Sequence, residues 1–218
     1  LGVVGARVQA DEHADYWRDA LRGAPEELSL PYDRRRSPEP AERSADVTTT
    51  ISSDASIALY EVAAVQGTPL VVIVLAAVAV LFSRLGAGRD MVLGAGRGMD
   101  GGDDSTVVPV RVDLSGNLSI ADALSRVRRT VQAGSAYAAA KFEDIVTAVG
   151  ATRSTARHPL FQTVVTHRAL EAEQDGSSRS ALRGHDSAAR LDLVFECIER
   201  ADSLDIRIEY ATDLFDRE

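Results

Sequence analysis

The sequence predicts a mixed α/β fold in which helices pack on a central sheet, and three features support this. The longest apolar run, Leu70–Phe82, is shorter than the ~20 residues of a membrane span and indicates a helix buried on nearly all sides. Asp90–Gly94 is almost wholly apolar between glycines, which is typical of a strand buried on both faces. Leu191–Cys197 and Leu204–Tyr210 alternate apolar and polar residues around a short turn, which predicts a hairpin.

The first half of the chain is predicted to hold three helices and one strand, bounded by residues that start or stop them. Capping residues or proline precede the helical stretches, and glycines follow them. The first predicted helix runs from Glu12 to Arg22, capped by Asp11 and ended by Gly23, and is followed by an extended piece from Glu26 to Pro31 and a connector from Arg34 to Ser44. A strand from Asp46 to Ser52 leads to a helix from Asp54 to Gln66, capped by Ser53 and ended by Gly67. The central helix runs from Thr68 to Arg84, with Thr68 as N-cap and Pro69 as first helical residue.

The connector contains three consecutive arginines, Arg34 to Arg36. Such a run could bind an anion, but short charge runs beside prolines are usually solvated, and we favour solvation.

The second half is predicted to alternate strands and helices around two irregular polar segments. It begins with a strand from Asp90 to Gly94, a flexible loop from Gly94 to Asp104 and a strand from Thr106 to Leu114. A helix capped by Ser119 runs through Ala140, with an inward stripe of Ile120, Ala123, Leu124, Val127 and Val131, and a shorter helix from Phe142 to Val149 ends at Gly150. The last elements are a strand from Pro159 to His167, a polar insertion from Arg168 to Ala189, and a hairpin with its turn at Arg200 to Ser203. Pro109 indicates an edge strand or a bulge, because proline cannot donate to a ladder.

Composition excludes some partners and indicates a compartment. The net charge of -9 disfavours nucleic acid and anionic membrane surfaces as partners. The single cysteine, Cys197, excludes an internal disulfide framework and is expected to be a buried apolar residue. The N-terminus has neither the features of a signal peptide nor an initiator methionine, so we expect a cytoplasmic location and a chain cut from a longer protein.

The residues alone indicate no catalytic site, metal site or cofactor site. The four histidines, His13, His158, His167 and His185, form no HH, HxH or HExxH pair. No Gly-x-Ser-x-Gly elbow is present, and Cys197 is predicted on a strand rather than at a helix N-terminus. A GxGxxG spacing occurs at Gly96–Gly101, but no helix follows it, and nearby aspartates would repel a phosphate. We therefore expect no enzyme activity from the chain in isolation.

Four segments resemble motifs of the condensation domains of nonribosomal peptide synthetases, in that family's order. Tyr16–Arg36 (YWRDALRGAPEELSLPYDRRR) is similar to YW…L…LPxDRxR, and Thr68–Gly94 to the family's apolar helix with its R-x-x-G-x-x-D turn. Arg153–Gln162 (RSTARHPLFQ) resembles R-x-x-x-R-x-P-L-F, and Tyr210–Asp216 (YATDLFD) resembles the C-terminal signature. The resemblance implies a single chloramphenicol-acetyltransferase-like lobe, with a mixed sheet and helices packed on it.

Other family motifs are missing or altered. The catalytic HHxxxDG motif lies in an N-terminal lobe that would precede Leu1, so the resemblance implies that residues 1–218 are the C-terminal lobe only, with an entry helix and linker at 10–44 and the α/β core at 45–218. The Gly-Phe-Phe-Val-Asn-Thr segment is replaced by an acidic stretch with Thr106 near the asparagine position, and HQDxPFE is reduced to Tyr137–Glu143.

The resemblance assigns no catalytic residue and gives structural roles to the matched positions. Arg84 and Asp90 could pair across their turn, Arg153 could tie the loop before the next strand, and Pro159 could fix the entry to that strand. The matched positions are Arg84, Asp90, Arg97, Phe142, Glu143, Arg153, Arg157, Pro159, Phe161, Gln162, Asp213, Phe215 and Asp216.

Two functions then remain open. The first is a truncated, catalytically inactive condensation-type lobe that serves as a docking platform for an adjacent adenylation or carrier domain. The alternative is the C-terminal half of an active amide-forming domain, whose HHxxxDG lobe is supplied upstream or by a partner chain. A free-standing CoA-dependent acyltransferase is a third, weaker possibility, since no general base is evident.

In the first two cases the resemblance implies no cofactor on this chain, because phosphopantetheine would be carried by the partner carrier protein. We expect Gly98–Ser105 to stay solvated, and contact with a neighbouring domain to use the C-terminal strand and Tyr210–Asp216.

Overall fold

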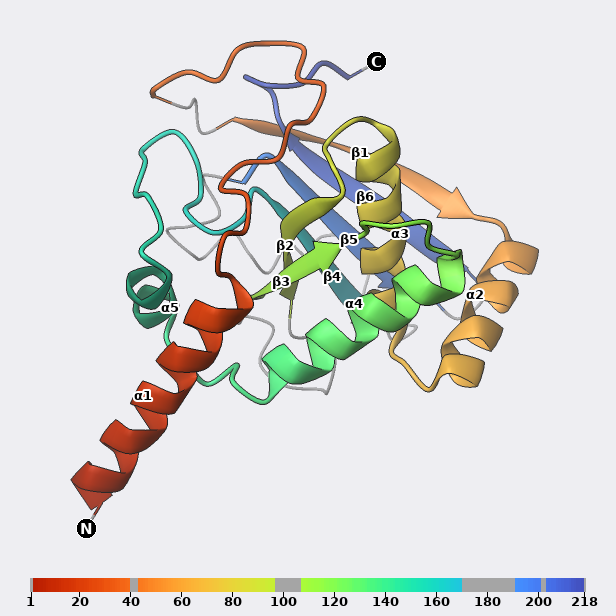
Figure 1. Ribbon diagram of the computed structural model, residues 1–218. Helices are drawn as coiled ribbons and strands as arrows, with labels where there is room; N and C mark the ends of the chain where they lie inside the picture. Colours follow the sequence, from red (N-terminus) through yellow and green to blue (C-terminus); the bar gives the residue numbers. More distant parts are fainter. Residues whose placement is uncertain (1, 40–42, 97–106, 170–190, 201–202, 218) are drawn as a thin grey trace.

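The computed structural model describes residues 2–39, 43–96, 107–169, 191–200 and 203–217, with side chains described from residue 11 onward. Five helices and six strands occur in these ranges (Figure 1). In chain order they are α1 (Gly2–Ala20), β1 (Ser44–Ile51), α2 (Ser53–Gln66), α3 (Leu70–Arg84), β2 (Asp90–Gly96), β3 (Val107–Asp113), α4 (Ile120–Ser135), α5 (Phe142–Val149), β4 (Thr163–Ala169), β5 (Leu193–Glu199) and β6 (Leu204–Ala211). The mixed α/β architecture predicted from the sequence is confirmed.

The six strands form one mixed sheet in the order β1-β6-β5-β4-β2-β3. The pairs β1/β6, β5/β6 and β2/β3 are antiparallel, whereas β4 runs parallel to both β2 and β5. The predicted hairpin is confirmed, with Glu199 opposite Leu204. The strand that contains Pro109 is an edge strand, as predicted, because β3 ends the sheet.

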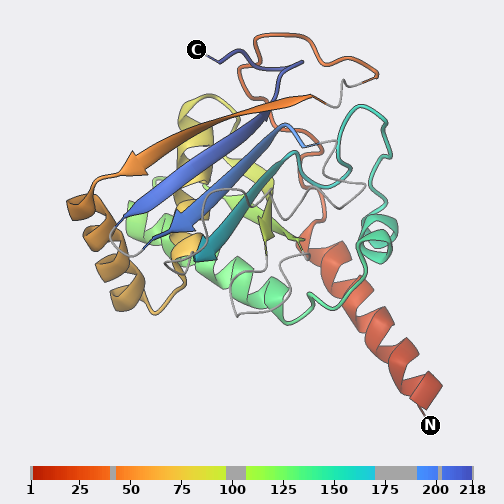
Figure 2. The same cartoon turned by 180° about the vertical axis from the view of Figure 1, so that it is seen from behind.

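Side chains on the two faces of the sheet belong to different hydrophobic clusters. On one face, α3 and α4 pack over the strands, and alternate residues of β2 such as Met91 and Leu93 join them. On the other face, Trp17 of α1 and Ile145 of α5 pack with Val92. This second cluster covers the β2, β3 and β4 end of the sheet, whereas no described helix lies over the same face of β1, β6 and β5 (Figure 2). That part of the face carries charged side chains, among them Asp46, Glu196 and Arg207.

Helix α3 is the centre of the larger cluster. Ten of its residues are buried, and Leu75 and Ala79 are 1% and 0% exposed. The predicted buried helix is confirmed, except that Ala77 and Leu81 are exposed. Within the described ranges no single helix is long and apolar enough to cross a membrane; α2 and α3 pass that test only as a pair, and they meet at a bend of 108°.

The predicted start of α3 is wrong. Pro69 occupies the N-cap position, and the helix begins at Leu70 without a side-chain cap. The Thr68 hydroxyl, expected to cap the helix, is buried and has no hydrogen-bond partner among the described residues. Packing of the apolar first turn therefore outweighs the loss of a cap at this site.

Other helix ends were predicted with mixed success. The Ser119 cap is confirmed as a capping box with Asp122, and Gly67 and Gly150 end α2 and α5 in the left-handed conformation. Helix α1 begins well before its predicted cap Asp11, and α2 is capped by Ser52 instead of Ser53. Helix α4 stops at Ser135 rather than Ala140, and Ile120 is 76% exposed, outside the inward stripe.

Several strand boundaries also differ from prediction. Strand β4 begins at Thr163, four residues after Pro159, and continues to Ala169 into the predicted insertion. Strand β2 extends two residues beyond Gly94. Most of the insertion and Gly98–Ser105 lie outside the described residues, so the expected solvation of Gly98–Ser105 stays a prediction.

Replacing Leu75 by alanine should lower the free energy of unfolding by about 2–5 kcal/mol, because the packed surroundings of α3 cannot collapse fully into the cavity. Val78→Ala should cost less, since it removes fewer buried methyl groups. Leu81→Ala is the matched control on the same helix, and its 45% exposed side chain predicts a cost below about 1 kcal/mol. Chemical denaturation measures all three, and equal costs for Leu75 and Leu81 would contradict the central role of α3.

Candidate functional site

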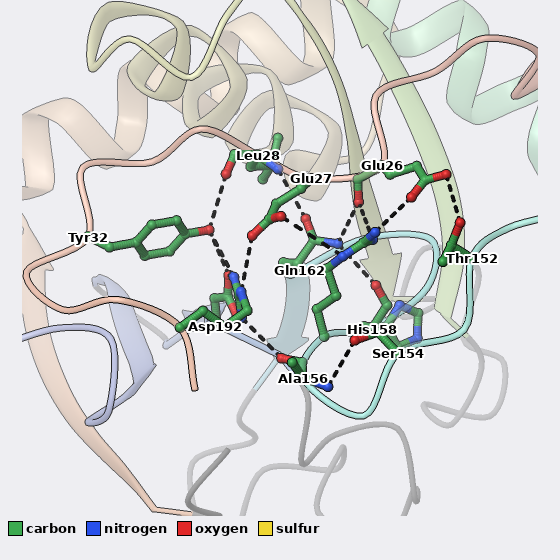
Figure 3. Close-up of polar contacts among 12 residues, drawn as sticks. Glu26, Glu27, Leu28, Tyr32, Thr152, Ser154, Ala156, His158, Gln162 and Asp192 are labelled. Carbon is green, nitrogen blue, oxygen red and sulfur yellow. Dashed lines mark hydrogen bonds and ion pairs between the residues drawn. The ribbon is translucent and has the colours of Figure 1, made fainter. Parts of the chain in front are cut away.

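A group of hydrogen-bonded polar side chains joins three segments that are far apart in the sequence. It contains Glu26, Glu27, Tyr32 and Arg36 from the segment after α1, Thr152, Arg157 and Gln162 from the loop before β4, and Asp192 at the start of β5 (Figure 3). We call these eight residues the polar junction. They include positions from two motifs of the sequence analysis, LPYDRRR and RSTARHPLFQ.

The pair Arg36–Asp192 is the least exposed ion pair of the junction. The Asp192 side chain is 2% exposed and that of Arg36 is 16% exposed. The guanidinium donates from its two terminal nitrogens to Oδ1 at 2.7 Å and to Oδ2 at 2.6 Å, and from Nε to Glu27 at 3.0 Å. Such bidentate geometry satisfies both carboxylate oxygens, which a buried charge requires.

Tyr32 completes the surroundings of this carboxylate. Its hydroxyl lies 2.9 Å from Asp192 Oδ2 and 3.1 Å from the carbonyl oxygen of Leu28. Burial raises the pKa of Tyr32, and the negative charge of Asp192 raises it further. Burial alone would lower the pKa of Arg36, but its hydrogen bonds to Asp192 raise it above the usual range. Both groups are therefore protonated at neutral pH.

Arg157 ties the loop before β4 to the segment after α1. It donates to the Glu26 carbonyl oxygen at 2.8 Å and to Glu26 Oε2 at 2.7 Å, and its side chain is 13% exposed. Thr152 donates its hydroxyl to the other carboxylate oxygen of Glu26 at 3.0 Å. The hydrogen bond from Arg157 is the main reason that the pKa of Glu26 is lowered, and the bond from Thr152 lowers it further.

Gln162 is 1% exposed, and both ends of its amide group are hydrogen-bonded. Nε2 donates to the carbonyl oxygens of Glu26 at 3.1 Å and His158 at 3.0 Å, while Oε1 accepts from the Leu28 N–H at 3.2 Å. One buried side chain thus bridges the segment after α1 and the start of β4.

The two histidines that could serve as bases are engaged in the fold. His158 is 2% exposed and stacks on Phe161, with ring centroids 4.1 Å apart; Phe142 lies on it at 4.9 Å. Its Nδ1 accepts from the backbone N–H of Phe161 at 3.2 Å, so in the neutral ring the proton is on Nε2. His167 pairs with Glu199 at 3.0 Å, outside the polar junction.

Cys197 is 0% exposed, and burial raises the pKa of its thiol to about 12, with a further contribution from Glu199. It is therefore the buried apolar residue that was predicted and not a nucleophile. Among the described residues, no group of three or more His, Cys, Asp or Glu side chains could hold a metal ion.

The predicted pair Arg84–Asp90 is wrong. Asp90 instead accepts from Arg111 Nε at 2.9 Å and from a terminal nitrogen at 2.7 Å, because the register of β2 and β3 brings Arg111 onto the same sheet face, while Arg84 is exposed. Arg153 pairs with Glu143 at the start of α5, an exposed contact between two of the matched positions. Arg97 lies outside the described residues.

The C-terminal signature contacts the segment after α1 beside the junction. Arg34 pairs with Asp216, and the backbone N–H of Asp33 donates to the Leu214 carbonyl oxygen at 3.0 Å. Phe215 lies against Tyr32, with ring centroids 5.4 Å apart, and Asp213 is partly buried. The expectation that Arg34 to Arg36 are simply solvated is therefore wrong for Arg34 and Arg36, because both make specific ion pairs.

The acidic and aromatic members of the junction were not predicted from the sequence. Asp192, Glu26, Glu27 and Tyr32 had no assigned role, although Arg36 and Asp192 are 156 residues apart in sequence and contact directly. The available signal was weak: Asp192 is a carboxylate between two leucines at the start of an alternating strand. Chemically, the junction pairs its acids with arginines, which stabilises the contacts between these segments.

Comparison with known proteins identifies one family. A family model for the condensation domain matches residues 6–218. The nonribosomal peptide synthetase CymA of Salinispora arenicola is 36% identical over 92% of this chain, and the dimodular nonribosomal peptide synthase of Bacillus subtilis is 32% identical over 93%. These matches span 3% and 9% of the two synthetases.

Solved structures give the same architecture. The X-domain of teicoplanin biosynthesis, in its complex with OxyB, is 28% identical with a TM-score of 0.83, and the match covers 96% of this chain and 49% of the X-domain chain. A four-domain nonribosomal peptide synthetase, holo-AB3403, is 20% identical with a TM-score of 0.81 over 95% of this chain and 18% of that protein, and therefore supports the fold alone. The chain thus spans about half of the X-domain and a small part of each synthetase.

We predict a large, non-additive loss of stability when the buried Arg36–Asp192 pair is mutated. Asp192→Asn or Arg36→Ala should each lower the free energy of unfolding by about 3–5 kcal/mol, because each leaves a buried partner uncompensated. The double variant should cost less than the sum of the two. The matched control is the exposed pair Asp15–Arg18, whose side chains are 69% and 50% exposed, and Arg18→Ala should cost less than about 1 kcal/mol. Additive costs in denaturant titrations would show that Arg36 and Asp192 do not stabilise each other.

Proposed function

Because this chain belongs to the condensation-domain family, we propose that it is a condensation-type lobe of a nonribosomal peptide synthetase that docks a neighbouring adenylation or carrier domain. Condensation domains act together with such domains in larger synthetases. In this proposal the lobe works in the cytoplasm, contributes no catalytic residue to amide-bond formation and binds no cofactor of its own, since phosphopantetheine would be carried by the carrier protein.

The proposal rests on one observation: the motif side chains of the polar junction are hydrogen-bonded within the chain itself. The side chains of the motif residues Arg36, Arg157 and Gln162 are hydrogen-bonded to Asp192, to Glu26 and to backbone groups of the same chain. A residue that acts on a substrate needs a free group within hydrogen-bond reach of it. The arrangement of these motifs therefore favours a structural role over a chemical one.

The titratable groups of the described core support the same conclusion. Acceptance of an amine proton needs an accessible base whose pKa lies near the working pH. His158 is buried with Nδ1 already accepting from the backbone, and the pKa of the Cys197 thiol is raised to about 12 by burial. A docking lobe needs no such base.

The comparison with the X-domain adds support for docking to a partner protein. That domain forms a complex with OxyB, and it is 28% identical to this chain over 96% of this chain and 49% of the X-domain chain. A domain that contains this fold can therefore bind a partner protein. We carry over only this general role, with a synthetase domain as the partner.

The alternative function is the C-terminal half of an active amide-forming condensation domain. The X-domain chain is about twice the length matched here, which leaves room in such proteins for a second lobe. The HHxxxDG lobe would then come from an upstream segment or a partner chain, and this lobe would form one wall of the site.

The chain should form no amide bond between aminoacyl carrier proteins, because none of its described groups is placed to take the amine proton. Product is measured by mass spectrometry against a heat-denatured control. Turnover would contradict the proposal, and His158→Ala and His167→Ala would then test which ring is responsible. Adding the N-terminal lobe of a related condensation domain separates the two functions: amide formation on addition favours the half-enzyme, and continued inactivity with retained binding to the adjacent domain favours the platform.

A further inference from the structure

The two edges of the sheet differ in how well they are protected from pairing with another strand. At one edge, β3 contains Pro109, which lacks a backbone N–H, and Arg111 of β3 donates to the Arg22 carbonyl oxygen at 2.8 Å. At the other edge, β1 has eight residues, SADVTTTI, without proline, lysine or arginine (Figure 2). Proteins usually block such an edge with proline, lysine, a bulge or a covering element. Strand β1 has none of the first three, and no described helix or strand lies beyond it.

The register shows which backbone groups of β1 point outward. The N–H of Thr212 donates to the Arg43 carbonyl oxygen at 3.1 Å, so those two residues form a hydrogen-bonded pair. In an antiparallel ladder such pairs alternate along the strand. The residues of β1 bonded to β6 are therefore the odd-numbered ones, and the outward-facing ones are Ser44, Asp46, Thr48 and Thr50. Four consecutive outward positions are enough to bind an extended segment of eight residues.

The same outward-facing residues carry side chains on the charged face of the sheet. Asp46 lies directly opposite Glu209 of β6, and like charges in that position repel. Arg207 is close to both Asp46, at 3.2 Å, and Glu196, at 3.5 Å, and its pKa is raised chiefly by the hydrogen bond to Asp46. Arg207 thus contacts two carboxylates, of which Glu196 is also paired with Arg168 at 3.0 Å. A cation added beside Asp46, whose side chain is 47% exposed, would complete the charge pattern.

We propose that the β1 edge binds an extended segment of a partner polypeptide by strand addition, with a lysine or arginine of that segment facing Asp46. Backbone hydrogen bonds to the four outward residues would supply affinity, and the contact with Asp46 would supply selectivity. The three threonines, Thr48 to Thr50, favour the extended conformation that this pairing needs.

A second copy of this chain fits the edge less well. Pairing of β1 with itself would bring another Asp46 to the edge and no cation, and each chain carries a net charge of -9.

The inference does not depend on the proposed function, since the edge is equally available in a docking lobe and in half of an enzyme. It names a different surface from the expected one at the C-terminal strand and Tyr210–Asp216, which stays a prediction; there β6 lies between β1 and β5, and Tyr210 is 7% exposed.

The test uses the full chain labelled with nitrogen-15 and two synthetic ten-residue peptides with blocked ends. One peptide alternates threonine and lysine, and the other alternates threonine and glutamate. We expect the lysine peptide to shift the amide resonances of the four outward residues of β1 and to bind at least tenfold more tightly than the glutamate peptide.

Two substitutions make the test specific. Asp46→Lys should reverse the preference between the peptides. Thr48→Pro should abolish binding of both, because it removes an outward N–H without removing a bond to β6, and Thr48→Val is the matched control that keeps the N–H and should bind normally. If Thr48→Pro disturbs resonances far from β1, the charge reversal at Asp46 alone decides the outcome.

Three results would overturn the inference. These are equal affinity for both peptides, resonance shifts confined to other parts of the chain or absent altogether, and self-association of the free chain through β1, which would assign the edge to a second copy.

Discussion

The buried carboxylate of Asp192 is the constraint on which the packing of the chain ends depends. At 2% exposure it requires a compensating cation, and the only guanidinium that contacts it in the described structure comes from Arg36, 156 residues earlier in the sequence. Satisfying this charge therefore fixes the segment after α1 against the start of β5. Glu26 and Arg157 extend the same principle to the loop before β4.

This constraint gives a physical account of the motifs that resemble those of condensation domains. LPYDRRR and RSTARHPLFQ lie far apart in sequence, yet Arg36 donates to the Ala156 carbonyl oxygen at 3.3 Å, so the two motifs are in direct contact. Nearby, Arg34 and Asp216 join the C-terminal signature to the first motif. Three of the four matched motifs thus form one assembly, which ties the segment after α1 and the C-terminal segment to the loop before β4.

Local sequence patterns predicted the elements well and their partners poorly. The apolar run of α3, the alternation of β5 and β6, and the Ser119 cap are signals carried within a few residues, and all three are confirmed. The Thr68 cap failed because tertiary packing, which the local pattern does not contain, decides the first turn of α3. Pairing is harder still: Asp90 was expected to pair with nearby Arg84, whereas the sheet register selects Arg111. The partners of the polar junction could not be predicted for the same reason.

Native-state hydrogen exchange tests most directly whether the polar junction belongs to the cooperative core. The informative amides are those of Leu28, which donates to Gln162 Oε1 at 3.2 Å, and Asp192, which donates to the Gln162 carbonyl oxygen at 2.7 Å. If the junction holds the lobe together, both amides should exchange only through global unfolding, with the same free energy as the amides in the middle of α3. Exchange of Leu28 and Asp192 through local opening, at a free energy well below that of α3, would contradict the account.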